Sequence, residues 1–189
     1  MCSSDLDGDH NHFTVYNELT LIERAWRAAD VAGLALLHDV GWPCGRRDAY
    51  YGPGGLPPEA VHPHSYNLGV TLDNPSLIRG GFRGEGHFAW ATQEGGPRNG
   101  VRTAVEDFLA EHPDYSFHSV DAVFGLGAVV RKGSAAEHAV LEVFAPYNNE
   151  LVRRLERNRL ELYLKVIELQ DTLNPPSPSR PAEPEKAQP

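Results

Sequence analysis

Apolar side chains recur with a helical period in the first part of the chain. Between residues 14 and 30 they follow one another at spacings of three and four, at Val15, Leu19, Ile22, Trp26 and Ala29. This spacing predicts an amphipathic helix. After Gly33 the pattern changes to a short continuous apolar run, 34–37, which ends in His38 and Asp39. A run of this length predicts a strand buried on both faces, as in a parallel sheet.

The middle of the chain has no sustained period. Residues 41–97 are rich in glycine and proline, and so long an irregular stretch in a compact domain predicts a functional lid or a loop insertion. Beyond it, Asn99 is expected to cap a second helix that stops at His112 and Pro113. The segments 115–120 and 122–130 predict two further strands.

The C-terminal part predicts a helix and then a tail. Residues 135–173 are expected to be helical, with a break near Pro146. The segment 151–173 carries a leucine-rich stripe at roughly heptad spacing, and we expect it to associate with a second chain in a homo-oligomer rather than pack on its own domain. Residues 174–189 include six prolines in sixteen residues and are expected to be disordered.

Helix, buried strand, insertion, helix and strand pair together predict an α/β fold. The chain has 189 residues, 41% of them hydrophobic, which is enough for the core of one ordinary domain. The net charge of −9 argues against a nucleic-acid partner, and no apolar run approaches the ~20 residues of a membrane helix. With only two cysteines, we expect a reduced, cytoplasmic setting.

The first residues predict a non-native leader. A strand that ends near Leu6 lies so close to the start of the chain that the domain is expected to be incomplete. In addition, Cys2–Leu6 can be encoded by the end of a common sequencing adapter, so residues 1–6 are interpreted as adapter read-through. Genomic DNA upstream of Asp7 that encodes this same start would contradict the interpretation.

Polar side chains gather after two of the predicted strands. Asp7, Asp9 and His10 follow one strand, and His38 and Asp39 end the next. Ligands bind at the carboxyl ends of parallel strands, and if these two strands are neighbours, we expect the two groups to meet there. Carboxylates of Asp7 and Asp39 would suit Mg²⁺ or Mn²⁺, which would leave His10 to move a proton. The alternative is a structural turn in which the carboxylates cap backbone groups and His10 caps the following helix.

The segment 41–51 is the most distinctive stretch of the chain. Arg46 and Arg47 are adjacent and lie among aromatic residues, Trp42 among them. Such a pair could clamp a carboxylate or phosphate, or stack on a sugar or base. The alternative is that the arginines form ion pairs with Asp39 or Asp48 and hold the loop in place. Cys44 has no nearby base in the sequence and is expected to be a packing residue.

Several of these segments resemble bacterial class I S-adenosylmethionine-dependent methyltransferases. The resemblance covers about 7–131, is most specific in 36–51 and 94–108, and rests on the segments 7–11, 16–19, 36–43, 45–48 and 94–101. It implies the strand order 3-2-1-4-5-7-6, with residues 6–9 ending strand four, 34–38 as strand five, and 115–130 as strands six and seven. The expected fold is therefore a partial Rossmann-like sheet of strands 4, 5, 7 and 6. Strands one to three and their glycine-rich donor loop would be absent, so no cofactor-binding residue is assigned.

Related sugar and natural-product O-methyltransferases, and cephalosporin-hydroxylase-like proteins, carry an Asp-x-x-His motif after strand four and an acidic pair after strand five. By this resemblance Asp7 and Asp39 are metal ligands and His10 is the base. His38 stands where the family has the first acidic residue, so it becomes a ligand candidate that shifts the preference away from Mg²⁺. Trp42 and the two arginines are assigned to the acceptor.

The resemblance implies O-methyl transfer from S-adenosylmethionine to a hydroxyl of a small-molecule or glycan acceptor, with a divalent metal in the members that use one. Residues 7–134 are then expected to be the C-terminal part of the methyltransferase domain, and 135–173 a helical segment. Two alternatives stay open. One is a metal-dependent hydrolase that uses the same carboxylates to activate water. The other is a non-catalytic remnant whose C-terminal helix mediates association.

Overall fold

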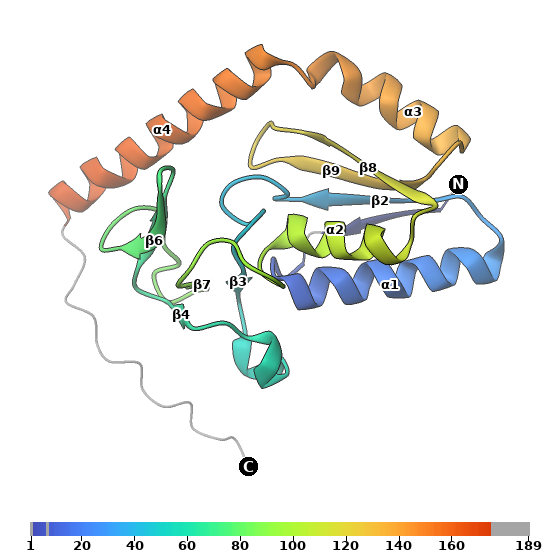
Figure 1. Cartoon of the computed structure of the whole chain (residues 1–189). Coiled ribbons are helices and arrows are strands. Elements are labelled where there is room, and N and C mark those ends of the chain that lie inside the picture. Colours follow the sequence, from blue (N-terminus) through green and yellow to red (C-terminus); the bar gives the residue numbers. More distant parts are fainter. Residues whose placement is uncertain (1, 7, 175–189) are drawn as a thin grey trace.

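The computed structural model describes residues 2–6 and 8–174 (Figure 1). The predicted metal ligand Asp7 and the tail predicted to be disordered from 175 onward lie outside the described residues. Within the described part, the chain is a mixed α/β protein with four α-helices and three small sheets. No helix in that part is long and apolar enough to cross a membrane.

The largest sheet has four strands in the order β1-β2-β9-β8. β1 is parallel to β2, and β9 is antiparallel to both of its neighbours. Residues 2–6 of the segment interpreted as a leader therefore form an edge strand of the sheet as far as the structure describes it, and the origin of the segment stays a prediction. The strands are β1 (Cys2–Leu6), β2 (Gly33–His38), β8 (Tyr115–Val120) and β9 (Leu126–Arg131).

Helices cover the two faces of this sheet. α1 (His12–Ala29) and α2 (Val101–Glu111) lie side by side on one face, and α3 (Ala135–Phe144) lies on the other (Figure 1). Successive residues of β2 point to opposite faces. Ala35 and Leu37 are buried with α1 and α2, whereas Leu34 and Leu36 are only partly buried beside α3. The sequence predicted that β2 is buried on both faces. The structure confirms this for the face toward α1 and α2 only, because α3 covers the other face incompletely.

The helix boundaries correct two sequence expectations. α1 starts at His12, where the Asn11 side chain accepts a hydrogen bond from the Thr14 N–H. The helix cap is therefore Asn11 and not His10. The second helix begins after Gly100, without a side-chain cap. Asn99 does not cap it, because its side-chain oxygen accepts from the Asp48 N–H instead, while its amide nitrogen donates to the carbonyls of Gln93 and Gly95.

Residues 41–97 are not the irregular loop that their sequence predicts. Three short strands pair in the order β3-β7-β4, and a hairpin of β5 and β6 follows. The insertion also buries large side chains, among them Tyr50, Val70 and Trp90. Strands this short carry too few side chains to produce a detectable period. They are β3 (Ala49–Tyr50), β4 (His64–Ser65), β5 (Gly69–Thr71), β6 (Asn74–Ile78) and β7 (Ala89–Ala91), with short 3₁₀ turns at Pro53–Gly55 and Pro58–Ala60.

The C-terminal helix is broken where the sequence predicts a break. α3 ends at Phe144, a 3₁₀ turn spans Ala145–Tyr147, and α4 runs over Glu150–Leu173. α4 leaves the sheet and lies along the insertion, beside the β5–β6 hairpin (Figure 1).

Glu137 fastens the first turn of α3 to strand β8. Its carboxylate accepts hydrogen bonds from the Ser116 hydroxyl and the Gly133 N–H, and His118 Nε2 lies 3.2 Å from it. These donors lower the pKa of Glu137 from 4.5 to about 2, the Ser116 hydroxyl most of all. A carboxylate with a lowered pKa stabilises the folded state above its unfolded pKa and loses that contribution as the pH falls through its folded pKa.

We therefore expect Glu137→Gln to be less stable than the parent chain at neutral pH. The difference in free energy of unfolding should shrink as the pH falls from about 4.5 to about 2. Urea denaturation at a series of pH values measures it. Glu142→Gln is the matched control, because it removes one carboxylate from an exposed site on the same helix. A difference that stays constant down to pH 2 would contradict the role of Glu137.

Candidate functional site

The candidate site lies where β1 and β2 end. The two strands are parallel and in register from Cys2↔Gly33 to Leu6↔Leu37, so their carboxyl ends are adjacent. His10 follows β1 and Asp39 follows β2, and Nε2 of His10 lies 3.2 Å from Oδ2 of Asp39. Asp39 has a φ of 56°, the left-handed conformation that Asp tolerates better than most residues. The prediction that these two polar groups meet is confirmed for this pair.

Two further carboxyl groups lie near His10. Asp9 accepts hydrogen bonds from the Asn11 amide and the Tyr51 N–H. Burial raises the pKa of Asp9 despite these donors. Burial also raises the pKa of Glu18, and the negative charge of Asp9 adds to this rise. His10 thus lies among three carboxyl groups, those of Asp9, Glu18 and Asp39.

The described residues do not form a metal centre on their own. No group of three or more His, Cys, Asp or Glu side chains suited to a metal occurs among residues 2–6 and 8–174. Of the predicted ligands, His38 is exposed at the end of β2 and Asp39 faces His10, while Asp7 is outside the described residues. The metal therefore stays a prediction, and we derive no chemistry from it.

Aromatic rings from four parts of the chain gather beside the His10–Asp39 pair. Trp42 is within 6.4 Å, ring centre to ring centre, of both Phe82 and Phe124. The ring centre of Phe88 lies 5.8 Å from that of Phe82 and 5.8 Å from that of Tyr51. The ring centre of Tyr51 in turn lies 6.3 Å from that of His10. Tyr163 of α4 also contacts Phe82 and Phe124. Trp42, predicted to bind the acceptor, is thus part of an extended aromatic group that reaches His10.

Arg47 needs a correction. Its side chain is 1% exposed, and its guanidinium donates to the carbonyls of Ala91 and Pro75. The guanidinium also lies 3.7 Å from the carboxylate of Glu94. Burial lowers the pKa of Arg47. A side chain enclosed in this way offers no donor to a ligand at the surface. Arg47 thereby joins β7 to β6. Its partners are not Asp39 or Asp48, the ion-pair partners in the alternative interpretation of the sequence.

Arg46 lies on the surface of the molecule. Its guanidinium donates to both carboxylate oxygens of Glu106 at 2.6 Å, and to the Thr103 hydroxyl at 3.1 Å. The bidentate contact raises the pKa of Arg46 and lowers the pKa of Glu106. The pair ties the loop to α2. Binding of the acceptor by Arg46 stays a prediction, because 44% of the side chain is exposed.

Cys44 is a packing residue, as the sequence predicts. It is a free cysteine buried in the larger hydrophobic core. Burial raises the pKa of its thiol well above the ordinary value. The thiol therefore stays protonated and unreactive.

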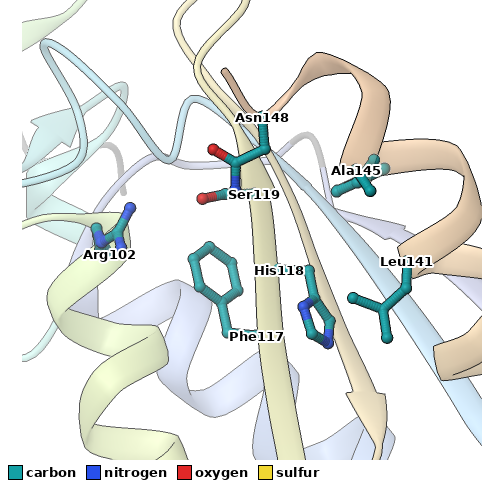
Figure 2. Close-up of a pocket in the computed structure, with 8 residues that line it drawn as sticks. Arg102, Phe117, His118, Ser119, Leu141, Ala145 and Asn148 are labelled. Carbon is teal, nitrogen blue, oxygen red and sulfur yellow. The ribbon is translucent and has the colours of Figure 1, made fainter. Parts of the chain in front are cut away.

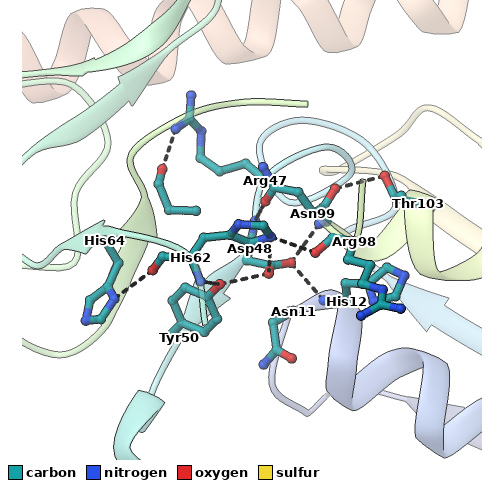
Figure 3. Close-up of polar contacts among 12 residues, drawn as sticks. Asn11, His12, Arg47, Asp48, Tyr50, His62, His64, Arg98, Asn99 and Thr103 are labelled. Atoms are coloured by element: carbon teal, nitrogen blue, oxygen red, sulfur yellow. Dashed lines mark hydrogen bonds and ion pairs between the residues drawn. The ribbon is translucent and has the colours of Figure 1, made fainter. Parts of the chain in front are cut away.

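Asp48 is the centre of the buried polar network that supports the site (Figure 3). The residue is fully buried, and one carboxylate oxygen accepts from the backbone N–H groups of His12 and Gly100, both at 2.7 Å. The other oxygen accepts from the Tyr50 hydroxyl at 2.8 Å. Burial raises the pKa of Asp48, although these donors and the nearby His62 oppose the rise.

Removal of the Asp48 carboxylate should destabilise the fold strongly. Asp48→Ala leaves two backbone N–H groups and one hydroxyl without an acceptor in the core, and we expect a loss of about 3–5 kcal/mol in the free energy of unfolding. Asp48→Asn keeps an acceptor oxygen and should cost less than half as much. Chemical denaturation of both variants measures this. Equal stability of Asp48→Ala and the parent chain would contradict the central role of Asp48.

The structure also has cavities away from His10. One, of about 430 Å³, lies between β8, α2 and α3, with Arg102, Phe117, His118 and Asn148 in its wall (Figure 2). Another, of about 610 Å³, lies between the β5–β6 hairpin and α4. His118, in the wall of the first cavity, has its Nε2 3.2 Å from Glu137 in the first turn of α3, so this histidine already has a structural partner.

Sequence reasoning missed two residues that shape the site. Asp48 was considered only as an ion-pair partner, although it stands in a run that is buried almost throughout, 47–50. Glu18 lies on α1, and its carboxylate comes close to Gly8. One carboxylate oxygen is 3.5 Å from the point where a Cβ would lie if Gly8 had a side chain. The sequence pattern gave no signal for either residue, because Asp48 follows two arginines and its burial is decided by distant segments.

Comparisons with protein-family models, with curated proteins and with solved structures found no match to this chain.

Proposed function

We propose that the described residues form the acceptor side of an S-adenosylmethionine-dependent O-methyltransferase that acts on a hydroxyl of a sugar or natural product. His10 is proposed as the base and Asp39 as the residue that positions it. The observation that carries the proposal is the position of the His10–Asp39 pair at the carboxyl ends of β1 and β2, in a sheet of this strand order.

The strand order supports the proposal because it is not the order of the strands along the chain. β9 comes last in the sequence but lies between β2 and β8. The resembled family has the order 4-5-7-6 in this part of its sheet, with the last strand inserted in the same way. In this assignment β1, β2, β8 and β9 correspond to strands four, five, six and seven.

The chemistry asks two things of these side chains. A bound methyl donor already carries an activated methyl group, so the protein must orient the acceptor oxygen and remove its proton. His10 takes up that proton, and the carboxylate of Asp39, 3.2 Å from Nε2, stabilises the imidazolium that forms. The His10 side chain is 12% exposed, which excludes most water while leaving access from the protein surface.

The aromatic group supplies a binding surface for the acceptor. Tyr51 is 57% exposed and lies next to His10, and Phe88 and Trp42 extend the surface away from it. Sugar rings and planar natural products bind well to flat aromatic faces, because apolar area is buried without loss of hydrogen bonds at the ring edges.

The test is methyl transfer by the protein that the genomic locus encodes. In the resemblance, no segment of these 189 residues corresponds to the donor-binding strands and the glycine-rich loop. The assay therefore uses the protein encoded by the full reading frame, with radiolabelled donor and a panel of hydroxylated acceptors. His10→Ala should lower kcat by about 10²-fold or more and leave the Kd of the donor nearly unchanged. Asp39→Asn keeps the side-chain shape and should lower kcat less, with a changed pH profile.

His138→Ala is the matched control, since this histidine is exposed on α3 on the other face of the sheet. It should leave turnover unchanged. Normal turnover by a folded His10→Ala variant would reject His10 as the base. A reading frame without a strand and a glycine-rich turn upstream of Asp7, or one that transfers no methyl group, would reject the proposed function.

A further inference from the structure

α4 is held to the rest of the protein by one side only. Leu160 is its buried residue, at 5% exposure. Glu156 accepts hydrogen bonds from the backbone N–H groups of Val123 and Phe124 in the β8–β9 turn. Near the other end of α4, Asp171 pairs with Arg83 of the insertion. These contacts fix the orientation of the helix and determine which side faces outward.

The outward side of α4 carries an apolar stripe. Positions 151, 162 and 173 are eleven residues apart, a period of about 3.67 residues per turn, so the stripe runs nearly straight along the helix. On a helical wheel it lies opposite Leu160 and Glu156. The exposed fractions are 66% for Leu151, 57% for Leu155, 68% for Leu162, 51% for Val166, 53% for Leu169 and 79% for Leu173. Asn158, also exposed, interrupts the stripe.

Such a surface needs a partner. Single exposed apolar residues are ordinary, but a row of six along a helix of 24 residues marks an interaction surface. The helix is about 36 Å long at 1.5 Å per residue. Three heptads make a marginal coiled coil in isolation, but here the helix is already formed and anchored, which lowers the entropy cost of association.

We propose that α4 binds the α4 of a second copy of this chain, antiparallel, with the two Leu162 side chains facing each other at a twofold axis. The charges along α4 favour this partner and this direction. The first half, 150–159, has four arginines and two glutamates, and the second half, 160–173, has three acidic residues and one lysine. Antiparallel packing sets the basic half against the acidic half of the second copy, whereas parallel packing sets like charges together.

The positions beside the stripe fit the same arrangement. Arg154 and Glu168 lie on the same flank of the stripe, one before and one after Leu162 and at similar distances from it. A twofold axis at Leu162 therefore brings Arg154 of one copy near Glu168 of the other. Lys165 and Glu161 are related in the same way. In one chain, Arg154 pairs with Glu150 and Lys165 with Glu168 at exposed positions. Exposed pairs of this kind contribute little and can be exchanged on association.

Sedimentation velocity of the full chain over a range of concentrations tests the proposal. The parent chain should be in monomer–dimer equilibrium. Leu162→Glu and Leu162→Lys should each weaken dimerisation at least about tenfold, because like charges meet at the axis. An equimolar mixture of the two variants should recover the dimer. Leu21→Glu is the control, because Leu21 is 63% exposed on α1, outside the stripe, and the variant should dimerise like the parent.

Charge reversal tests the direction of the helices. Arg154→Glu should weaken the dimer, and Arg154→Glu combined with Glu168→Arg should restore it, with circular dichroism to show that α4 stays helical. A parent chain that is monomeric at every concentration, or a Leu162→Glu variant that dimerises as well as the parent, overturns the proposal. A dimer that the double charge reversal does not restore overturns the antiparallel arrangement.

Discussion

The buried carboxylate of Asp48 is the constraint on which the rest of the site depends. It accepts hydrogen bonds from the first residue of α1, from the residue that precedes α2, and from Tyr50 in the insertion. Both helices thus direct their N-terminal ends, where the helix dipole is positive, toward the same negative charge. Burial of the charge is costly, as the raised pKa indicates. The helix N-termini and the hydroxyl offset much of that cost, and the three segments cannot separate without exposing unpaired donors.

This arrangement determines where the candidate base lies. Because the start of α1 is fixed to Asp48, the short connection from β1 to α1 has little freedom. The His10 carbonyl accepts from the Ala49 N–H, one residue beyond Asp48. This backbone hydrogen bond holds His10 in place independently of its own side chain, whose Nε2 lies 3.2 Å from Asp39. In the proposed function, this placement would preorganise His10 for proton transfer.

α4 joins parts of the chain that the sheet does not connect. Its inner side binds the β8–β9 turn through Glu156, and Arg159 lies 4.4 Å over the ring of Phe124. Through Tyr163 the helix also completes the aromatic group beside the site. The same docking leaves the leucine stripe outward.

The sequence by itself determined the main elements, since each depends on a local pattern. The period of Val15, Leu19 and Trp26 predicted α1, the apolar run before His38 predicted β2, and Pro146 predicted the break before α4. The meeting of His10 and Asp39 also followed from sequence, because the carboxyl ends of adjacent parallel strands must share an edge. A pattern within one segment was enough for each element, whereas the meeting of His10 and Asp39 also required that β1 and β2 be neighbours.

Tertiary structure alone decided the rest, because the remaining partners are distant in sequence. Arg47 was expected to bind a ligand, but two carbonyls of the insertion occupy it, and no local pattern encodes such contacts. Strands of two to five residues in 41–97 are stabilised by their neighbours in space and not by their own propensity. Which side of α4 faces outward was likewise undecided in the sequence, since both sides carry apolar residues. The contacts of Glu156 and Asp171 with segments up to 88 residues away in the sequence determine which side faces outward.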